Sequence, residues 1–160
     1  IIPTITVMNL SPITKKLKNI NVLGVNTQSA VSVDLVGGKH DIFSEENLNK
    51  NTDNTYEYTT KLNKRTADNY SKPILEIRNN TTDPKEISFY GQTLNQTQSN
   101  IGIIVNDKLY RIQDDLGQTY PETITVEPSQ KVIVFLAIEN LTGIQFSEDF
   151  NLQVKLVENL

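Results

Sequence analysis

Few residues of this chain could perform acid–base or nucleophilic chemistry. His40 is the only histidine, and there is no cysteine among the 160 residues, so a zinc site built from histidine and thiolate ligands lacks its donors. A catalytic triad would have to use His40, and no Gly-x-Ser-x-Gly sequence presents a serine to it. We interpret His40, which follows Gly37-Gly38, as a surface turn residue.

Carboxylates occur as three adjacent pairs, Glu45-Glu46, Asp114-Asp115 and Glu148-Asp149. Glycoside hydrolysis needs two carboxylates that face each other across a cleft, whereas adjacent side chains on a strand point to opposite sides. The pairs are therefore typical of solvated edges. We predict that the protein is not an enzyme.

Two polar segments contain the oxygen ligands that Ca²⁺ prefers. One holds Asn49, Asn51 and Asp53, and the other is the run Asp114-Asp115-Leu116-Gly117. Neither matches a calcium loop with its central glycine and terminal glutamate, and no glycine-rich phosphate loop occurs. We interpret both segments as solvated turns and predict no metal ion or cofactor.

Charge and composition exclude several classes of partner. Fifteen Lys and Arg against nineteen Asp and Glu give a net charge of −4, and the short basic clusters at 15–18 and 61–65 have no interleaved aromatic residues, so we predict no nucleic-acid binding. There is no tryptophan, which argues against a sugar site built on a large aromatic face. The longest uninterrupted apolar run, residues 132–138, is too short to span a bilayer.

The chain begins Ile1-Ile2-Pro3 rather than with methionine. We interpret this as the end left by removal of a secretion signal, the alternative being a boundary trimmed for another reason. Six Asn-x-Ser/Thr sequences are candidate N-glycosylation sites, although an Asn- and Thr-rich composition also produces such sequences; they are Asn9, Asn69, Asn79, Asn80, Asn95 and Asn140. We therefore expect an extracellular, cell-surface protein that carries surface glycans.

The composition favours strands over helices. Alanine, the best helix former, occurs three times, whereas Ile, Val and Thr occur 17, 12 and 17 times. Segments that alternate between apolar and polar residues predict about nine to eleven short strands with frequent turns between them. The expected strands are residues 1–8, 20–25, 29–36, 55–62, 73–78, 86–90, 101–105, 109–112, 123–126, 131–141 and 151–157, with a short segment at 145–146 after a turn.

Three further local predictions follow from the residue types. The polar segment 44–54 is expected to be a loop with at most one helical turn. Asn106-Asp107-Lys108 is expected to be a compact hairpin turn, and Glu127-Pro128-Ser129-Gln130 a type I turn. In the run 132–138, alternate residues should face opposite sides of a central strand that is covered on both sides, by a neighbouring subunit if the protein assembles.

These patterns predict an all-β fold, an antiparallel two-sheet Greek-key β-sandwich. We expect one sandwich domain over residues 17–160, preceded by an N-terminal strand and hinge at 1–16. The alternative to a separate N-terminal strand is that residues 1–10 form an ordinary edge strand of their own sandwich.

A processed, cysteine-free, Asn/Thr-rich sandwich preceded by the alternating strand IIPTITVM resembles exported filament subunits, namely bacterial pilins of the chaperone–usher type and archaeal surface filaments. The resemblance is one of architecture across the whole chain, and this chain lacks the disulfide of many such pilins. It implies an immunoglobulin-like, pilin-like sandwich that is completed by the N-terminal strand of a neighbouring copy.

The resemblance predicts a structural subunit of an extracellular, pilus-like filament, a head-to-tail homopolymer in which each copy binds other copies of itself. Ile1, Ile5 and Val7 would fill pockets of the acceptor subunit as an assembly strand, since strand addition combines main-chain hydrogen bonds with pockets for alternate side chains. Two alternatives stay open: a viral capsid or tail protein with a jelly-roll-like sandwich, and a monomeric surface adhesion or binding module.

Overall fold

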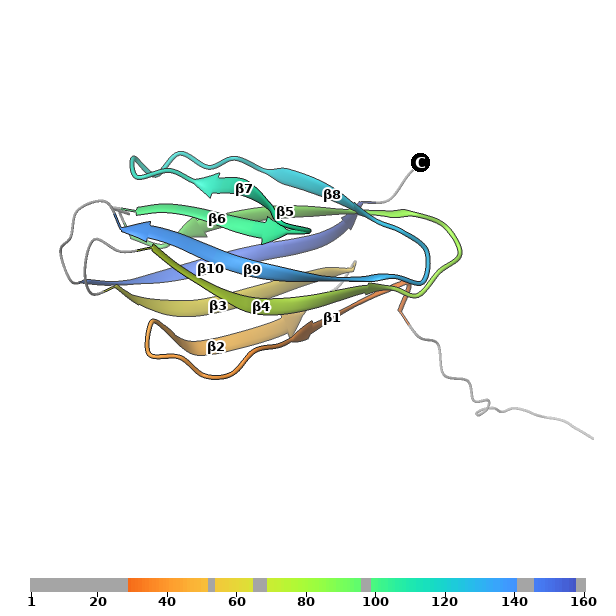
Figure 1. Ribbon diagram of the computed structural model, residues 1–160, viewed down its shortest axis with the longest axis horizontal. Helices are drawn as coiled ribbons and strands as arrows, with labels where there is room; N and C mark the ends of the chain where they lie inside the picture. Colours follow the sequence, from red (N-terminus) through yellow and green to blue (C-terminus); the bar gives the residue numbers. More distant parts are fainter. Residues whose placement is uncertain (1–28, 52–53, 65–68, 96–98, 141–145, 158–160) are drawn as a thin grey trace, which may run out of the picture.

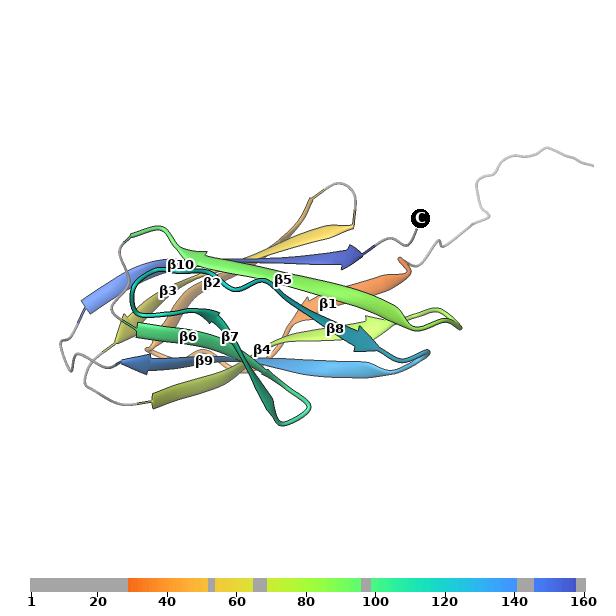
Figure 2. The ribbon, with the colours of Figure 1, turned by 90° about the horizontal axis from the view of Figure 1, so that it is seen from above.

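The computed structural model describes residues 29–51, 54–64, 69–95, 99–140 and 146–157. These residues form ten strands in two sheets of five strands each (Figures 1 and 2). One sheet has the order β1-β4-β9-β6-β7 and the other β2-β3-β10-β5-β8, and every pairing is antiparallel. The predicted all-β, antiparallel two-sheet sandwich is confirmed, whereas the strands expected at 1–8 and 20–25 lie outside the described residues.

Eight of the strands pair as a nested hairpin whose tip is the turn between β6 and β7. The partners, from the outermost pair inward, are β3 (Thr55–Lys64) with β10 (Phe146–Val157), β4 (Asn69–Asn79) with β9 (Lys131–Asn140), β5 (Lys85–Thr93) with β8 (Glu122–Val126), and β6 (Ser99–Val105) with β7 (Lys108–Gln113). The hairpin folds over so that successive pairs alternate between the sheets. This is the strand order of a jelly roll, a sandwich of two Greek keys, and it differs from the immunoglobulin-like order that the resemblance implied.

Two N-terminal strands extend the jelly roll. β1 (Val31–Leu35) pairs with β4, and β2 (Phe43–Lys50) pairs with β3, so each sheet gains one edge strand. Within each sheet, every described strand is hydrogen-bonded to the strands beside it. No helix among the described residues has the length and apolar character needed to cross a membrane.

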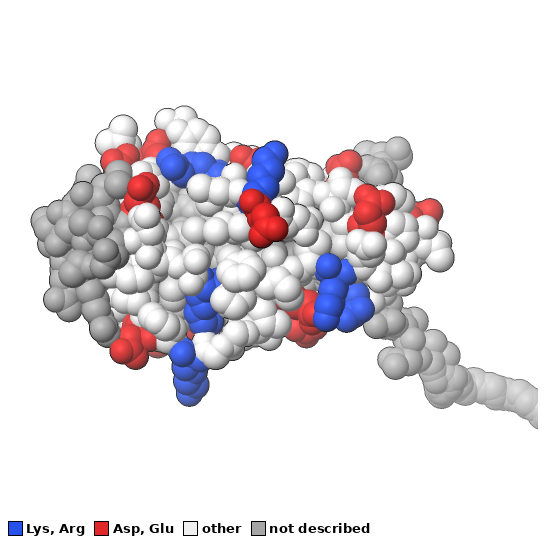
Figure 3. Space-filling model, viewed as in Figure 1, with Lys and Arg blue, Asp and Glu red and all other residues white. Residues whose placement is uncertain are grey.

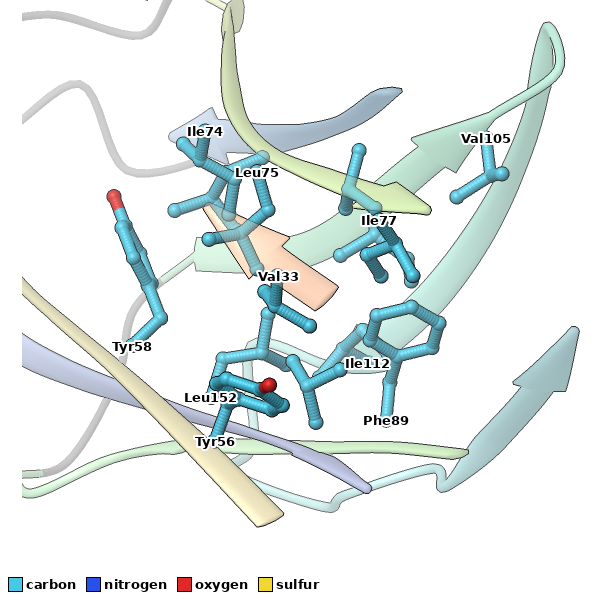
Figure 4. Packing of buried hydrophobic residues seen from close by; sticks show 14 of the residues in the cluster. Val33, Tyr56, Tyr58, Ile74, Leu75, Ile77, Phe89, Val105, Ile112 and Leu152 are labelled. Carbon is cyan, nitrogen blue, oxygen red and sulfur yellow. The ribbon is translucent and has the colours of Figure 1, made fainter. Parts of the chain in front are cut away.

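The core lies between the sheets and is made by the alternation that the sequence predicted. On β3, Tyr56, Tyr58 and Leu62 are buried, and the central strand β9 buries Val132, Val134, Leu136 and Ile138. Figure 4 shows Leu75 and Ile77 of β4 pointing toward Leu152 and Phe89 of the other sheet. These contacts remove the largest apolar side chains from water, which is the main favourable term in folding.

The prediction of a loop at 44–54 is wrong, because most of that segment is the edge strand β2. A β-bulge between Ser44 and Asn47 breaks the alternation, and Glu45 adopts a φ of 53° there. The extra residue re-aims the next side chain, so Glu46 points into the sandwich. A polar residue at an inward position hid the strand from a search for period-two hydrophobicity.

Glu46 meets a lysine from the opposite sheet. Lys72 Nζ lies 2.7 Å from Glu46 Oε1, and the Tyr58 hydroxyl donates a hydrogen bond of 2.7 Å to Glu46 Oε2. Lys72 is only 6% exposed; its inward position precedes a second bulge, between Pro73 and Leu75. The two bulges thus turn opposite charges toward each other across the sandwich.

The turns are partly as predicted. Asn106 and Asp107 both have positive φ, 52° and 63°, and connect Val105 to Lys108, which face each other in register; this is the compact hairpin turn that was expected. Ser129 has a φ of 61°, so the turn at 127–130 is type II rather than the expected type I, because type II combines the negative φ that Pro128 fixes at the second residue with a positive φ at the third. Phe146, from the short segment expected at 145–146, and the strand expected at 151–157 belong to the single strand β10, whereas residue 145 lies outside the described residues.

Replacement of a core residue on β9 should cost more stability than replacement of its outward neighbour. Leu136 is fully buried, so Leu136→Ala should lower the free energy of unfolding by about 2–5 kcal/mol through the cavity it leaves. Phe135 is only half-buried on the outer side, and Phe135→Ala should cause a smaller loss. Equal losses in urea unfolding would contradict this assignment of faces.

Breaking the inter-sheet ion pair should be costly, whereas removing both partners should not. Lys72→Met leaves the Glu46 carboxylate without its cation and should lower the free energy of unfolding by about 3–5 kcal/mol. The double variant Lys72→Met, Glu46→Gln removes both charges, keeps an acceptor for the Tyr58 hydroxyl and should recover most of that loss. This expectation is wrong if the loss in free energy of unfolding of the double variant equals the sum of the losses of the Lys72 and Glu46 single variants.

Candidate site on the outer face of the sandwich

The outer face of the β1-β4-β9-β6-β7 sheet is apolar at its centre. Ile133, Phe135 and Ala137 point outward from β9 and are half-buried, while Leu109 on β7 is 55% exposed. Figure 3, viewed like Figure 1, looks onto this sheet and shows few charged side chains in the middle of the face. The predicted split of residues 132–138 between two faces is confirmed.

Cross-strand register arranges the outward residues in three parallel rows. The apolar row is Pro73, Phe135, Ile104 and Leu109; the small-residue row is Ser71, Ala137 and Gly102, with Arg111 at its β7 end; the polar row is Asn69, Glu139 and Asn100. Each row crosses the strands, whose spacing is about 4.8 Å. Because Ser71, Ala137 and Gly102 have small side chains or none, this row is lower than the rows on either side.

The low row forms a hollow that we call the trough. Its volume is about 320 Å³, and it is lined from the apolar row by Ile104 and Leu109 and from the polar row by Asn69, Asn100 and Glu139. Gly102 has to lack a side chain, since a Cβ there would lie 2.7 Å from the Tyr110 carbonyl oxygen and 2.9 Å from Leu109 Cδ1. The close approach of Leu109 over this glycine makes one wall of the trough.

The polar wall is held by a chain of hydrogen bonds. Arg111 Nη1 donates to Asn100 Oδ1 at 2.8 Å, and Asn100 Nδ2 donates to Glu139 Oε1 at 3.4 Å. The backbone N–H of Asp115 also donates to Asn100 Oδ1, at 3.2 Å. Asn100 thus links a cation and an anion on neighbouring strands and fixes the direction in which each points.

Sequence reasoning missed the polar wall because its members lie far apart along the chain, on β6, β7 and β9. The one available signal was the run 132–138, which is apolar at every position and so predicted an apolar outer face. It carried no information about which strands would flank β9.

A second hollow, of about 600 Å³, lies beside the connection between β1 and β2 and is lined in part by Glu46. Burial, together with the Glu46 carboxylate, raises the pKa of Tyr58 well above its usual range, so the phenol stays protonated and donates to Glu46. Because Glu46 already binds Tyr58 and Lys72, this cluster has the features of a structural contact.

In two of the three adjacent pairs the carboxylates point apart, as expected, but the prediction that these pairs are solvated edges is wrong, because one carboxylate of each pair is largely withdrawn from solvent. Glu46 points inward, whereas Glu45 is exposed; Glu148 is buried, whereas Asp149 forms a salt bridge with Lys61 at 3.1 Å. Among the described residues, no three His, Cys, Asp or Glu side chains gather as a metal-ion site would require. His40 is exposed, and its Nδ1 accepts a hydrogen bond from the Ile42 backbone N–H.

Asp114, named above as a possible calcium ligand, organises its own loop. Its Oδ1 accepts hydrogen bonds from the backbone N–H groups of Leu116 and Gln118, at 3.0 and 2.8 Å, and its Oδ2 accepts one from the Tyr120 hydroxyl. The other loop candidates, Asn49 and Asn51, are exposed, and Asp53 lies outside the described residues.

The candidate glycosylation sites differ in accessibility. Asn69 and Asn95 are exposed and Asn80 is half-buried. Asn79 is fully buried, and its Nδ2 donates to the carbonyl oxygens of Asp83 and Val126 at 2.7 and 2.9 Å, so this fold leaves no room for a glycan on Asn79. Asn9 and the side chain of Asn140 lie outside the described residues, as do Ile1, Ile5 and Val7.

Comparison with known proteins identifies no family. No family model matches the chain, and no curated protein matches it. Among solved structures, CBM35 from Cellvibrio japonicus Abf62 is similar at 12% sequence identity and a TM-score of 0.30, with 79% of this chain and 99% of that chain covered.

The loop at Asp114 should lose its order at low pH. Hydrogen bonds, chiefly from the Gln118 backbone N–H, lower the pKa of Asp114. The ionised carboxylate therefore stabilises the folded loop fully above the unfolded-state pKa of about 3.9, and this stabilisation is lost as the pH falls through the lower pKa of the folded state. The amide resonances of Leu116 and Gln118 should therefore titrate below about pH 4. Asp114→Asn should remove this titration; its persistence in the variant would assign it to another group.

Proposed function

We propose that this chain is a non-catalytic binding module whose binding surface is the outer face of the β1-β4-β9-β6-β7 sheet. The observation that carries the proposal is the trough, a concave surface with one apolar wall and one hydrogen-bonding wall. Small-ligand sites combine an apolar lining with a few placed polar groups and have volumes of about 300–1,000 Å³. At about 320 Å³ the trough suits a small ligand or one group of a larger one.

The arrangement does not resemble a reaction centre. Arg111 and Glu139 are both hydrogen-bonded to Asn100. The residues that line the trough include one serine, Ser71, and no cysteine or histidine, so the lining does not supply the usual pairing of a nucleophile with a histidine base. Its polar groups are suited to orienting a ligand by hydrogen bonds. The jelly-roll order is itself shared by lectin and viral capsid domains, so the capsid alternative stays open.

Assembly into a filament stays a prediction. Within each sheet every described strand is paired with its neighbours, and the edges of the described sheets are β1 and β7 in one and β2 and β8 in the other, so a strand donated by another copy would pair at one of these edges. Edge strands present unpaired backbone groups that can accept such a strand. Export and glycosylation likewise stay predictions.

A fragment screen by ¹H–¹⁵N NMR tests the module with no assumption about its ligand. A library of neutral, cationic, anionic and aromatic fragments should include some that shift the amides of Gly102, Arg111 and Ala137. Ala137→Leu should abolish those shifts because the larger side chain fills the low row. Ser88→Leu, a similar enlargement on an outward position of the other sheet, should leave them unchanged.

The proposal is wrong if no fragment shifts the trough amides, or if every bound fragment shifts residues of the β2-β3-β10-β5-β8 sheet instead. Thermal melting of Ala137→Leu and Ser88→Leu confirms that both variants are folded before their spectra are compared.

A further inference from the structure

The structure points to a neutral, polyhydroxylated ring, such as a pyranose sugar, as the ligand class of the trough; this inference rests on the proposed function. Support for it comes in four parts, from the charge of the trough, its mixture of donors and acceptors, its apolar wall and its direction across the strands.

The first part is charge. The cation of the trough wall, Arg111, and the anion, Glu139, are joined through Asn100 by hydrogen bonds of 2.8 and 3.4 Å. The wall therefore presents no net charge to a ligand. An anion that binds Arg111 would be repelled by Glu139, and a cation that binds Glu139 would be repelled by Arg111. Binding of either kind of ion is therefore disfavoured.

The second part is hydrogen bonding. The wall offers donors, from the remaining N–H groups of Arg111, the second N–H of the Asn100 amide and the amide of Asn69, close to acceptors, from Glu139 and the Asn69 carbonyl group. A ligand that pairs with neighbouring donors and acceptors of the wall has to accept and donate hydrogen bonds at adjacent atoms of its own. A hydroxyl group does both, and a ring with neighbouring hydroxyls does so repeatedly.

The third part is the opposite wall. Ile104 and Leu109 present aliphatic surface on the opposite side of the small-residue row from Asn100 and Glu139, and Ala137 contributes a methyl group to the floor. A pyranose has an apolar C–H face and a hydroxyl-bearing edge, so it can contact both walls at once. The aromatic residue of the lining, Tyr70, packs against the core, and the wall that faces the ligand's C–H surface is aliphatic, so we expect a dissociation constant of about 1–10 mM for a single ring.

The fourth part separates a sugar from a peptide strand. The trough crosses β4, β9 and β6, whose backbone groups are already engaged in the antiparallel ladders. An extended peptide in the trough could not form the main-chain hydrogen bonds that give strand addition its affinity. A compact ring does not need them.

The test is an NMR titration of the full chain with methyl β-glucopyranoside, methyl β-galactopyranoside, methyl α-mannopyranoside, methyl β-glucuronide, choline and N-acetylleucine amide. At least one neutral glycoside should shift the amides of Gly102, Arg111 and Ala137, with about tenfold tighter binding than the glucuronide or choline. Asn100→Leu should weaken that binding about tenfold, whereas Asn47→Leu, the same change at an exposed position of β2, should not.

A change of preference gives a readout that a merely structural role would not produce. Glu139→Gln leaves Arg111 without its compensating anion, so the variant should bind methyl β-glucuronide about tenfold more tightly than the wild type does, through a charge-assisted hydrogen bond. Glu86→Gln makes the same change in net charge at an exposed position on β5 and should bind it no better.

The outcomes distinguish the two proposals. If the glucuronide, choline or the amide binds the wild-type trough as tightly as the glycosides, the polyol class is wrong while the binding module stands. If neither the glycosides nor any fragment of the screen shifts the trough amides, both proposals are wrong. Binding of the glycosides that Ala137→Leu leaves intact would place the sugar site elsewhere and overturn this inference.

Discussion

The two-residue period of β9 is the constraint on which the rest of this structure depends. β9 is the central strand of its sheet, paired with β4 on one side and β6 on the other, and its even-numbered residues from Val132 to Ile138 are buried against the opposite sheet. Once those four side chains face inward, the intervening residues must face outward. Because Ile133, Phe135 and Ala137 are apolar, the sandwich presents an apolar outer face, and the neighbouring strands determine what surrounds it.

The two bulges show how the same constraint is broken locally. A bulge shifts the register by one residue and sends a side chain to the other face. In β2 this turns Glu46 inward, and in β4 it allows Lys72 and Leu75 both to be buried. Each charge alone would be costly in the interior; together with the Tyr58 hydroxyl they satisfy one another. The pair ties the added edge strand β2 to the opposite sheet, which the backbone hydrogen bonds of β2 alone would not do.

Sequence alone predicted the strands where apolar and polar residues alternate regularly, as on β1, β3 and β8, and predicted β9 from its continuous apolar run. It did not predict β2, where the inward residue is a glutamate, nor the full length of β4, which contains Pro73. That proline is tolerated because β1 pairs with β4 only from Leu75 onward, so no partner on that side needs its missing N–H. Asn79 was predicted as a glycan site from its sequence motif, while its burial depends on carbonyl groups of residues 83 and 126 that only the fold brings near.

The candidate site is a property of pairing between strands, which a single sequence does not contain. Gly102, Ala137 and Ser71 are unremarkable as separate residues, and they form a trough only because the registers of β4, β9 and β6 place them side by side. The polar wall likewise needs β7 beside β6, so that Arg111 reaches Asn100. The nested hairpin brings β4, β9, β6 and β7 together in this order in one sheet. A shift of one residue at β9 would move Ala137 into the core and Leu136 onto the trough floor, so the buried face that stabilises the fold also maintains the shape of the binding surface.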